Sequence, residues 1–209
     1  MPRSRMDELF AIAEDNDGLL TSKQARGAGI IDSVLVRLAQ RGRLKRAARG
    51  VYRIAQYPQV RLSQYREAIL WAKASRGPKD AALSHETALA VYGISDANPS
   101  HVHITVPKSA RLRKKRPTWI TIHRDNLRSS DAYEYEGLPV TTVSRTIADL
   151  LSTFARIDLV RQAIRDAKRA GLISSTEAAR LKRRVNQSGH QFDEDGSLPD
   201  SKRDLERMV

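Results

Sequence analysis

The chain has 209 residues, of which 40% are hydrophobic, and carries a formal net charge of +13 with a pI near 10.4. This length suits two compact domains that each bury their own core. Cysteine is absent, which excludes disulfides, thiolate zinc sites and cysteine nucleophiles. The charge predicts a polyanionic partner, either nucleic acid or an acidic membrane, although a genome that favours arginine codons would produce the same charge.

We expect a cytoplasmic protein with no membrane partner. The longest apolar runs, such as residues 68–72, are far too short to span a bilayer. Residues Met1 to Arg5 lead directly into a segment that contains Asp7 and Glu8, which is unlike a secretory signal.

The first 41 residues predict three short helices joined by tight turns. Asp17-Gly18 stops the first helix, and Leu19-Leu20 forms a short extended piece after it. Gly29 supplies the turn before the third helix. The expected helices are Met6–Asn16, one that Thr21 or Ser22 caps and that runs to Ala28, and Ser33–Arg41 with Asp32 as its cap.

The third helix separates into an apolar face and an outer face. The apolar residues at helical spacing, which we expect to point inward, are Ile31, Val34, Leu35 and Leu38. A projection at about 100° per residue places four residues on the outer face, namely Ser33, Val36, Arg37 and Gln40. Arginine can pair with guanine edges, glutamine with adenine edges, and an exposed valine suits a thymine methyl group. These four residues are predicted to read bases; the alternative is a solvated face in a winged helix that docks protein.

A basic hairpin is predicted after Gly42, where basic and apolar residues alternate around Ala47-Ala48-Arg49-Gly50. Its basic residues, predicted to contact phosphates, are Arg43, Lys45, Arg46, Arg49 and Arg53. Gly50 is expected either to adopt a positive backbone angle at the tip or to be an ordinary hairpin glycine. Two short helices followed by a basic hairpin outline a winged helix-turn-helix.

The order of these motifs resembles that of AbiEi-type antitoxins from type IV toxin–antitoxin systems. The matching N-terminal residues are Gly18-Leu19-Leu20-Thr21, Ala25-Arg26, Gly29-Ile30, Leu38, Gly42-Arg43-Leu44 and Arg49-Gly50-Val51-Tyr52-Arg53. The matching downstream segments are residues 83–89, 102–107, 137–142 and 145–150. The resemblance covers roughly Met6 to Leu151 and depends on the order of the motifs, because each one is short.

This resemblance implies a protein that binds inverted repeats in its own promoter and represses the operon. It also implies that the protein counteracts a toxin resembling nucleotidyltransferases, without a stable complex between the two. Some relatives stand alone without an evident toxin. The implied partners are double-stranded DNA and, where one exists, that toxin.

The second half of the chain predicts alternating helices and strands. Tyr57-Pro58 ends the hairpin, which makes residues 56–62 a linker. The expected helices are Ser63–Ser75, Ser84–Tyr92, the stripe from Val143 to Leu151, Ile157–Ala170 and Thr176–Val185. The expected strands are His101–Val106, Trp119–His123 and Gly137–Thr141, the last at a sheet edge because it contains proline. From Asn186 onward the polar sequence predicts a tail or a single docked helix.

A basic run separates the first two of these strands. Residues 108–116 include six basic residues and no acidic one. A second contact with phosphates is one interpretation, and a solvated loop is the other. The residues of this possible second contact are Arg111, Arg113, Lys114, Lys115 and Arg116.

The sequence lacks the motifs of several enzyme classes. It has no Gly-x-x-x-x-Gly-Lys loop, no Gly-x-Ser-x-Gly elbow and no Glu-x-Lys of restriction-type nucleases. We therefore predict no catalytic residues and no cofactor.

Histidines provide the one candidate metal set. His101 and His103 share a strand face, and His123 could lie on the neighbouring strand. Alternating strand histidines without a carboxylate motif are more often ordinary surface or cross-strand residues, so we expect no metal. The pairs His85–Glu86 and Arg145–Asp149 are interpreted either as buried polar pairs or as caps and helix salt bridges.

The sequence therefore predicts an α+β protein with an N-terminal winged helix-turn-helix and a mixed α/β C-terminal domain. The predicted boundaries are 1–55 for the winged helix, 56–62 for the linker, 63–185 for the α/β antitoxin-like domain and 186–209 for the tail. We predict a sequence-specific DNA-binding protein, autorepressor and antitoxin. The rivals are a nuclease or nucleotidyltransferase-like enzyme targeted by its winged helix, and a module that neutralises a toxin by contact.

Overall fold

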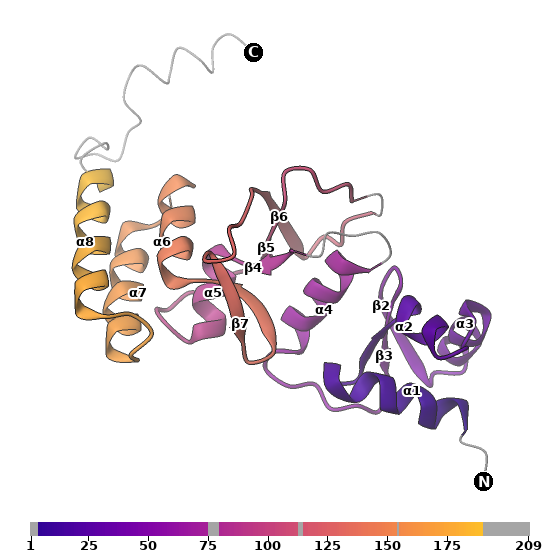
Figure 1. The fold of residues 1–209 in the computed structure, drawn as a ribbon. Helices are drawn as coiled ribbons and strands as arrows, with labels where there is room; N and C mark the ends of the chain where they lie inside the picture. Colours follow the sequence, from indigo (N-terminus) through magenta and orange to yellow (C-terminus); the bar gives the residue numbers. More distant parts are fainter. Residues whose placement is uncertain (1–3, 75–79, 113–114, 154, 190–209) are drawn as a thin grey trace.

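The computed structural model describes residues 4–74, 80–112, 115–153 and 155–189, which form an elongated α+β molecule (Figure 1). Its helices are α1 (Arg5–Ala13), η1 (Glu14–Asn16, 3₁₀), α2 (Ser22–Gly27), α3 (Asp32–Gln40), α4 (Ser63–Lys73), α5 (His85–Tyr92), α6 (Val143–Ser152), α7 (Ile157–Arg169) and α8 (Ser175–Gly189). Its strands are β1 (Leu19–Thr21), β2 (Leu44–Ala48), β3 (Val51–Ile54), β4 (Ala82–Leu83), β5 (Val102–Val106), β6 (Ile120–Arg124), β7 (Ala132–Tyr135) and β8 (Leu138–Thr141). Within the described ranges, no helix has the length and apolar character needed to cross a membrane.

The N-terminal module packs α1, α2 and α3 against an antiparallel sheet of order β1-β3-β2. Capping boxes start two of the helices, with Ser4 and Asp7 at α1 and Thr21 and Gln24 at α2. In each box the cap hydroxyl accepts from a backbone N–H, and the second side chain accepts from the backbone N–H of the cap. The core contains Leu9, Ala13, Leu20, Ala25, Ile30, Leu35, Leu44, Tyr52 and Ile54. Three helices followed by a hairpin confirm the predicted winged helix-turn-helix.

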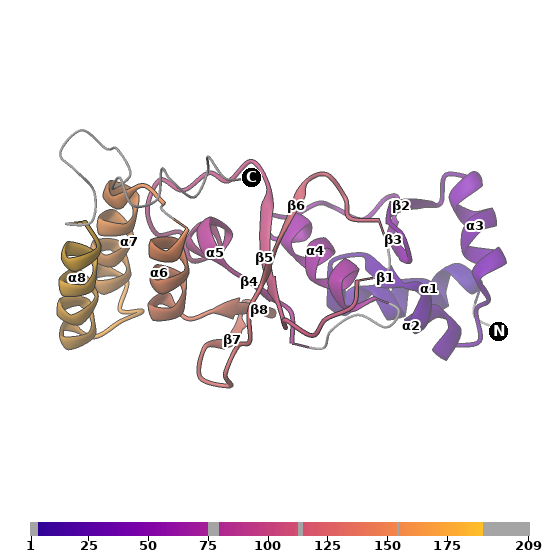
Figure 2. The same ribbon diagram turned by 90° about the horizontal axis from the view of Figure 1, so that it is seen from above.

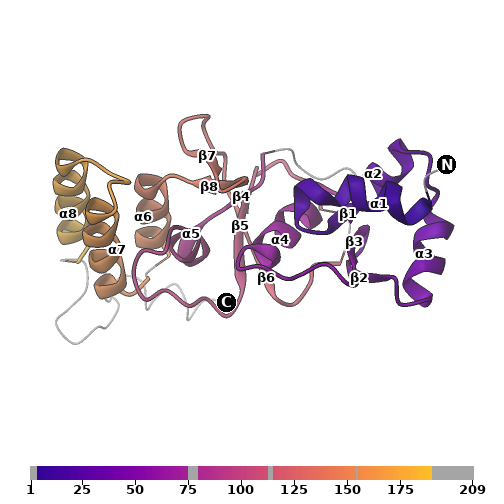
Figure 3. The ribbon, with the colours of Figure 1, turned by 90° about the horizontal axis from the view of Figure 1, so that it is seen from below.

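A mixed five-stranded sheet of order β6-β5-β4-β8-β7 forms the centre of the second module. The pairs β5–β6 and β4–β8 are parallel, whereas β4–β5 and β7–β8 are antiparallel. Helix α4 lies on the side of this sheet that faces the winged helix, and α5 lies on the other side (Figures 2 and 3). Helix α6 packs against α5, and α7 and α8 pack against α6 on the side away from the sheet. The α+β class is therefore confirmed.

The last helix continues past its predicted end. Helix α8 reaches Gly189, whereas the sequence pattern placed its end at Val185. The first residues of the predicted tail are thus helical, and the remainder, from residue 190 onward, lies outside the described residues.

Two features of the larger sheet differ from the prediction. Strands β4 and β7 were not predicted, because β4 has only two residues and β7 carries exposed Glu134 rather than a clear apolar alternation. Strand β8 lies inside the sheet and not at its edge. The sheet accommodates Pro139 because short β4 pairs with β8 only at Leu83 and Val140, and Pro139 itself stands opposite Glu134 of β7.

Helix α4 connects the two modules through a shared core. Leu19 and Val51 of the small sheet are fully buried in the same apolar cluster as Trp71 of α4 and the strands of the larger sheet. Arg66 of α4 donates from Nε to Asp17 Oδ2 at 2.9 Å and from Nη1 to the Gly137 carbonyl at 3.1 Å. One helix thus contacts both sheets, and the predicted boundary at residue 55 is crossed by continuous packing.

The turn before β1 requires glycine. Gly18 has φ +77°, and a Cβ atom at this position would lie 2.2 Å from Cγ of Tyr57. Both the backbone conformation and the close approach of the aromatic ring exclude a side chain here.

Candidate nucleic-acid interface

Helix α3 lies at the end of the molecule away from the second module (Figures 2 and 3). Leu35 is fully buried and anchors the helix, while Val34 and Leu38 are partly buried against the same core. The four predicted base-reading residues are all exposed, namely Ser33, Val36, Arg37 and Gln40. Val36 is 46% exposed. The predicted outer face is therefore accessible to a ligand; its reading of bases stays a prediction.

The start of α3 differs from the prediction in two ways. Ile31 was expected to point inward, but it is 62% exposed, because Ile30 takes the buried position in the preceding turn. Asp32 was expected to cap the helix, but the N-cap residue is Ile31 and no side chain caps it. Asp32 instead accepts from Arg26 Nη1 at 2.8 Å, which ties α3 to α2.

The hairpin β2–β3 forms the wing. Its tip contains Gly50 with φ +79°, so the positive backbone angle is confirmed. A register shift between Arg46 and Ala48 marks a bulge near the tip. The exposed basic residues of this segment are Arg43, Lys45, Arg46 and Arg49. None of the four forms an ion pair with a residue that the structure describes, so their charges remain available to an anionic ligand.

Arg53 does not belong with these phosphate-binding candidates. Its residue exposure is 5%, its Nη1 donates to the Asp17 carbonyl at 3.3 Å, and its Nη2 lies 3.6 Å from Glu67 Oε2. β3 is the central strand of the small sheet, and α4 packs against that sheet. The prediction of a phosphate contact for Arg53 was wrong, because the side chain is enclosed between the two modules.

Sequence reasoning missed one further cation beside this surface. Arg41 is exposed directly after α3, and it has no ion-pair partner among the described residues. Two features of the sequence could have indicated it. Arg41 lies at the end of the predicted recognition helix, and Asp32 is the only acidic residue between Gly18 and Ile54.

The second basic segment lies in the connection between β5 and β6, which extends toward the wing side of the molecule (Figures 1 and 2). Arg111, Lys115 and Arg116 are exposed, whereas Arg113 and Lys114 lie outside the described residues. At the start of this segment, Lys108 Nζ pairs with Asp125 at 3.2 Å. Its contact with phosphates stays a prediction.

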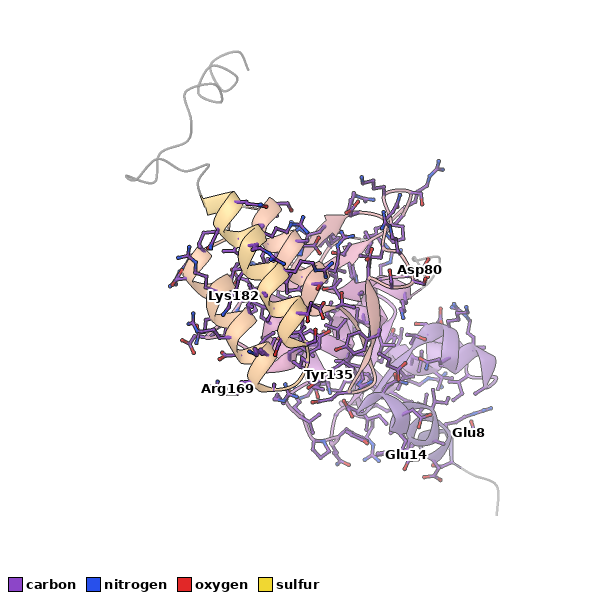
Figure 4. All side chains as sticks on the ribbon, turned by 60° about the vertical axis from the view of Figure 1, so that its left-hand side comes forward. Glu8, Glu14, Asp80, Tyr135, Arg169 and Lys182 are labelled. Carbon is purple, nitrogen blue, oxygen red and sulfur yellow. The ribbon has the colours of Figure 1, made fainter. Side chains whose placement is uncertain are left out.

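Acidic side chains on α1 and η1 and basic side chains on α7 and α8 lie at opposite ends of the molecule. Glu8 and Glu14 lie on α1 and η1 beside the winged helix, while Arg169 and Lys182 lie on α7 and α8 at the opposite end (Figure 4). Arg169 pairs with Asp166 at 2.9 Å. The cations of α7 and α8 are therefore far from α3 and serve as comparison positions for the wing.

The second module contains a polar cluster around three histidines. His103 Nδ1 lies 3.0 Å from His123 Nε2, and the rings of His85 and His123 stack with centroids 3.5 Å apart. His101 is exposed and contacts Ser100 instead. The candidate set of His101, His103 and His123 therefore differs from the observed cluster in one member, because His85 enters from the start of α5 and His101 stays outside.

Burial keeps these imidazoles neutral. Desolvation, followed by the nearby His123 and His103, lowers the pKa of His85 to about 3. Desolvation and His103 lower the pKa of His123 to about 4, and desolvation also lowers the pKa of His103. Neutral imidazoles keep free ring-nitrogen lone pairs, which is the state that binds metal ions.

An arginine and three aspartates stand beside the histidines. Arg145 of α6 donates to Asp125 Oδ2 at 2.5 Å, to Asp149 Oδ1 at 2.7 Å and to Asp131 Oδ2 at 3.4 Å. The hydrogen bond from Arg145 lowers the pKa of Asp125, whereas burial raises the pKa of Asp149 in spite of Arg145. The Arg145–Asp149 pair is thus an i,i+4 salt bridge within α6 and also part of a partly buried network, so both interpretations of this pair apply.

Together, an uncovered helix and a basic hairpin on a winged-helix scaffold define the N-terminal module as a DNA-binding domain of the regulator class. Comparison with known proteins agrees, because residues 7–55 match the family model described as "Transcriptional regulator, AbiEi antitoxin". This part of the chain is therefore similar to the transcriptional-regulator domain of AbiEi antitoxins. The resemblance of the second module to the same family stays a prediction.

Solved structures share the fold. Three chains match, among them the crystal structure of the RV2827C protein from Mycobacterium tuberculosis, with a TM-score of 0.56 and 15% sequence identity. That likeness covers 83% of this chain and 69% of the other. At this identity it shows a common fold alone. No curated protein matches the sequence.

Proposed function

We propose that this protein is a sequence-specific DNA-binding repressor that uses α3 to read bases and the wing to hold phosphates. The observation that carries the proposal is the set of exposed cations that have no ion-pair partner among the described residues and lie next to the exposed outer face of α3. The proposed base-reading residues are Ser33, Val36, Arg37 and Gln40, and the proposed phosphate contacts are Arg43, Lys45, Arg46 and Arg49.

The dimensions of α3 suit this role. Its nine residues correspond to a length of about 13 Å, and a helix diameter of about 10–12 Å fits a major groove roughly 12 Å wide. Arg37 and Gln40 stand about one turn apart and can address neighbouring base pairs, while Val36, directly before Arg37, can contact a thymine methyl group. The β2–β3 hairpin beside α3 brings its cations to the adjacent phosphate backbone.

The phosphate contacts set the expected salt dependence. Four contacts per bound chain predict a slope of log affinity against log salt of about −3.6. An inverted-repeat operator that binds two copies would double this value to about −7. Arg41 and the basic segment that contains Arg111, Lys115 and Arg116 would add to the slope if they reach the same DNA.

The family of the N-terminal domain favours a finer proposal. The protein would act in the cytoplasm as an autorepressor and as the antitoxin of a type IV toxin–antitoxin operon, against a nucleotidyltransferase-like toxin and without a stable complex with it. The α/β module from residue 63 to residue 185 would supply the antitoxin function. Support for this part comes from the family of the winged helix and from the downstream motifs, not from a catalytic site.

The repressor function can be tested with the purified full-length protein and random duplex DNA. Repeated selection should enrich one sequence motif, and that motif should occur as an inverted repeat upstream of the gene. A reporter driven by that promoter should be repressed by the wild-type protein and released by the double variant Arg37→Ala/Gln40→Ala. Failure to enrich any motif, with binding that depends on salt alone, would contradict sequence-specific recognition.

The antitoxin function requires a separate test. Co-expression with the neighbouring gene should relieve any growth arrest that this gene causes alone, and the two proteins should not co-purify. Stable co-purification would support neutralisation by direct contact instead. Growth arrest that continues during co-expression would contradict the antitoxin role and leave the repressor proposal intact.

A further inference from the structure

The histidine cluster of the second module brings together ring nitrogens from three separate elements. His85 begins α5, His103 lies on β5 and His123 lies on β6. One ligand nitrogen from each side chain can be chosen so that all three lie within 4.8 Å of one another. Such convergence from a helix and two strands positions donor atoms without any contribution from a flexible loop.

The closest two nitrogens are nearly at the separation that a shared metal ion requires. His103 Nδ1 and His123 Nε2 are 3.0 Å apart. Two imidazole nitrogens bound tetrahedrally to Zn²⁺ at about 2.05 Å lie roughly 3.3 Å apart. A metal ion would replace the proton that the two nitrogens share, and a few tenths of an ångström of movement would be sufficient for this pair.

Ser84 orients the third imidazole. Its Oγ lies 3.0 Å from His85 Nδ1 and also accepts from the Thr105 hydroxyl at 2.8 Å. When His85 Nδ1–H donates to Ser84, Nε2 keeps its lone pair for a metal ion. A fixed partner on the second ring nitrogen is characteristic of metal-binding histidines.

The backbone at His85 supports the same interpretation. His85 is 5% exposed and has φ +53°, a left-handed conformation that is uncommon for residues other than glycine. Ser84 is the N-cap residue of α5, yet its side chain makes no capping hydrogen bond to the helix. The local sequence therefore gives up favourable helix geometry at the position where the imidazole enters the cluster.

A cavity adjoins two of the three imidazoles. His85 and His123 line a cavity of about 570 Å³ together with Lys108, Arg145 and Asp149. Asp149 is 8% exposed, and its Oδ2 atom is buried without a hydrogen-bond partner among the described residues. Arg145 fixes the other oxygen, Oδ1, at 2.7 Å. The cavity leaves room beside His85 and His123 for a water molecule on a bound metal ion.

We propose that His85, His103 and His123 bind one divalent transition-metal ion, with Zn²⁺ the best match, and that its remaining coordination position faces the cavity beside Asp149. Three imidazoles and a water molecule form a typical zinc set, whereas Mg²⁺ and Ca²⁺ prefer oxygen ligands. On binding, the stacked rings of His85 and His123 turn apart about their terminal torsions, and the cavity beside them provides the space. The inference is independent of DNA binding by the winged helix.

The direct test is a metal titration of the full-length protein, without a histidine tag and after treatment with a chelator. We expect one equivalent of Co²⁺ to bind, with the visible absorption of a low-coordinate site, and Zn²⁺ to displace it. His103→Asn and His123→Asn should each weaken binding by at least about 100-fold, more than the loss of an outer hydrogen-bond partner usually costs. His101→Asn is the matched control, because His101 lies next to β5, is exposed and is outside the cluster.

A second measurement uses the wild-type protein and avoids any variant that fails to fold. Zn²⁺ should change the imidazole nitrogen resonances of His85, His103 and His123 and leave those of His101 unchanged. It should also raise the melting temperature of the wild type, because the ion binds only the folded state. Absence of stoichiometric binding, or equal loss in His101→Asn, would overturn the proposal and reduce the cluster to three hydrogen-bonded imidazoles.

Discussion

Arginine has opposite environments in the two modules. On the wing, Arg46 and Arg49 are exposed and form no ion pair with a described residue. On α6, the side chain of Arg145 is 15% exposed and pairs with three aspartates. A surface cation without a partner keeps its attraction for an anionic ligand, while a cation enclosed by carboxylates is already neutralised and holds elements together. The net charge of +13 therefore overstates what is available to DNA and says nothing of where it lies.

The largest effect that this comparison predicts is on stability. Arg145→Ala should lower the free energy of unfolding by about 3 kcal/mol, because it leaves buried Asp149 without its only cationic partner among the described residues. Urea denaturation measures the change, and the folded fraction should bind DNA as the wild type does. Arg156→Ala is the control, because that arginine pairs with Asp158 in full exposure and should show no measurable change. Equal changes in the free energy of unfolding for the two substitutions would contradict the structural role given to Arg145.

The second prediction concerns the turn before β1, where Gly18 lies against the ring of Tyr57. Gly18→Ala should destabilise the protein by about 2 kcal/mol or more, since the left-handed backbone and the overlap with the Tyr57 ring both oppose a methyl group. Gly29→Ala is the matched control, with φ +76° and open space around the added atom. It should cost only about 1 kcal/mol. Thermal unfolding of both variants would test the difference, and a similar cost for both would mean that Tyr57 moves aside.

The third prediction concerns base reading by α3. Arg37→Ala and Gln40→Ala should each reduce discrimination between the selected operator and a scrambled duplex by about 1 to 3 kcal/mol. Stability should stay within about 0.5 kcal/mol of the wild type, because both side chains are exposed. Competition binding measures the discrimination, with Lys182→Ala on α8 as a charge-matched control for Arg37→Ala. A loss of affinity that is equal for both duplexes would assign these residues to backbone contacts.

The smallest predicted effect separates two neighbouring arginines on the hairpin. Arg49→Ala should make the salt slope less negative by about 0.9 and leave sequence preference and stability unchanged. Arg53→Ala should leave the salt slope unchanged and lower the stability of the protein, because Arg53 is buried beside Glu67 and is not exposed to DNA. Binding isotherms at several salt concentrations, together with unfolding curves, measure both effects. A reduced slope in Arg53→Ala would show that the side chain reaches phosphate after all.

Local patterns in the sequence predict most of the winged helix. Helical periodicity gives the exposed face of α3, and the turn residues give the positive angle at Gly50. These features depend on residues that are neighbours in the chain. Ile31 and Asp32 were placed wrongly because the exact start of a short helix depends on the turn that precedes it, where Ile30 enters the core.

The errors at Arg53 and in the histidine set have a different cause. An alternating hairpin pattern cannot show that α4 will cover one face of β3, so it cannot distinguish a buried arginine from an exposed one. In the same way, nothing near His85 in the sequence indicates that β5 and β6 will bring His103 and His123 against it. The serine–histidine pair at the start of α5 was the only local signal. It indicates a cluster only once the sheet order shows that β5 and β6 are neighbours.

The shared packing on α4 has a consequence for dividing the protein into parts. A fragment that ends at residue 55 would place Leu19 and Val51 at its surface and leave Arg53 without Glu67. Such a fragment would tend to aggregate through the uncovered sheet even though its own helices and hairpin are intact. A minimal DNA-binding fragment should therefore extend through α4 to residue 73, with polar substitutions on the apolar side of that helix that normally faces the larger sheet. We therefore expect the shortest autonomous unit of this chain to be longer than residues 7–55, the part that matches the family model.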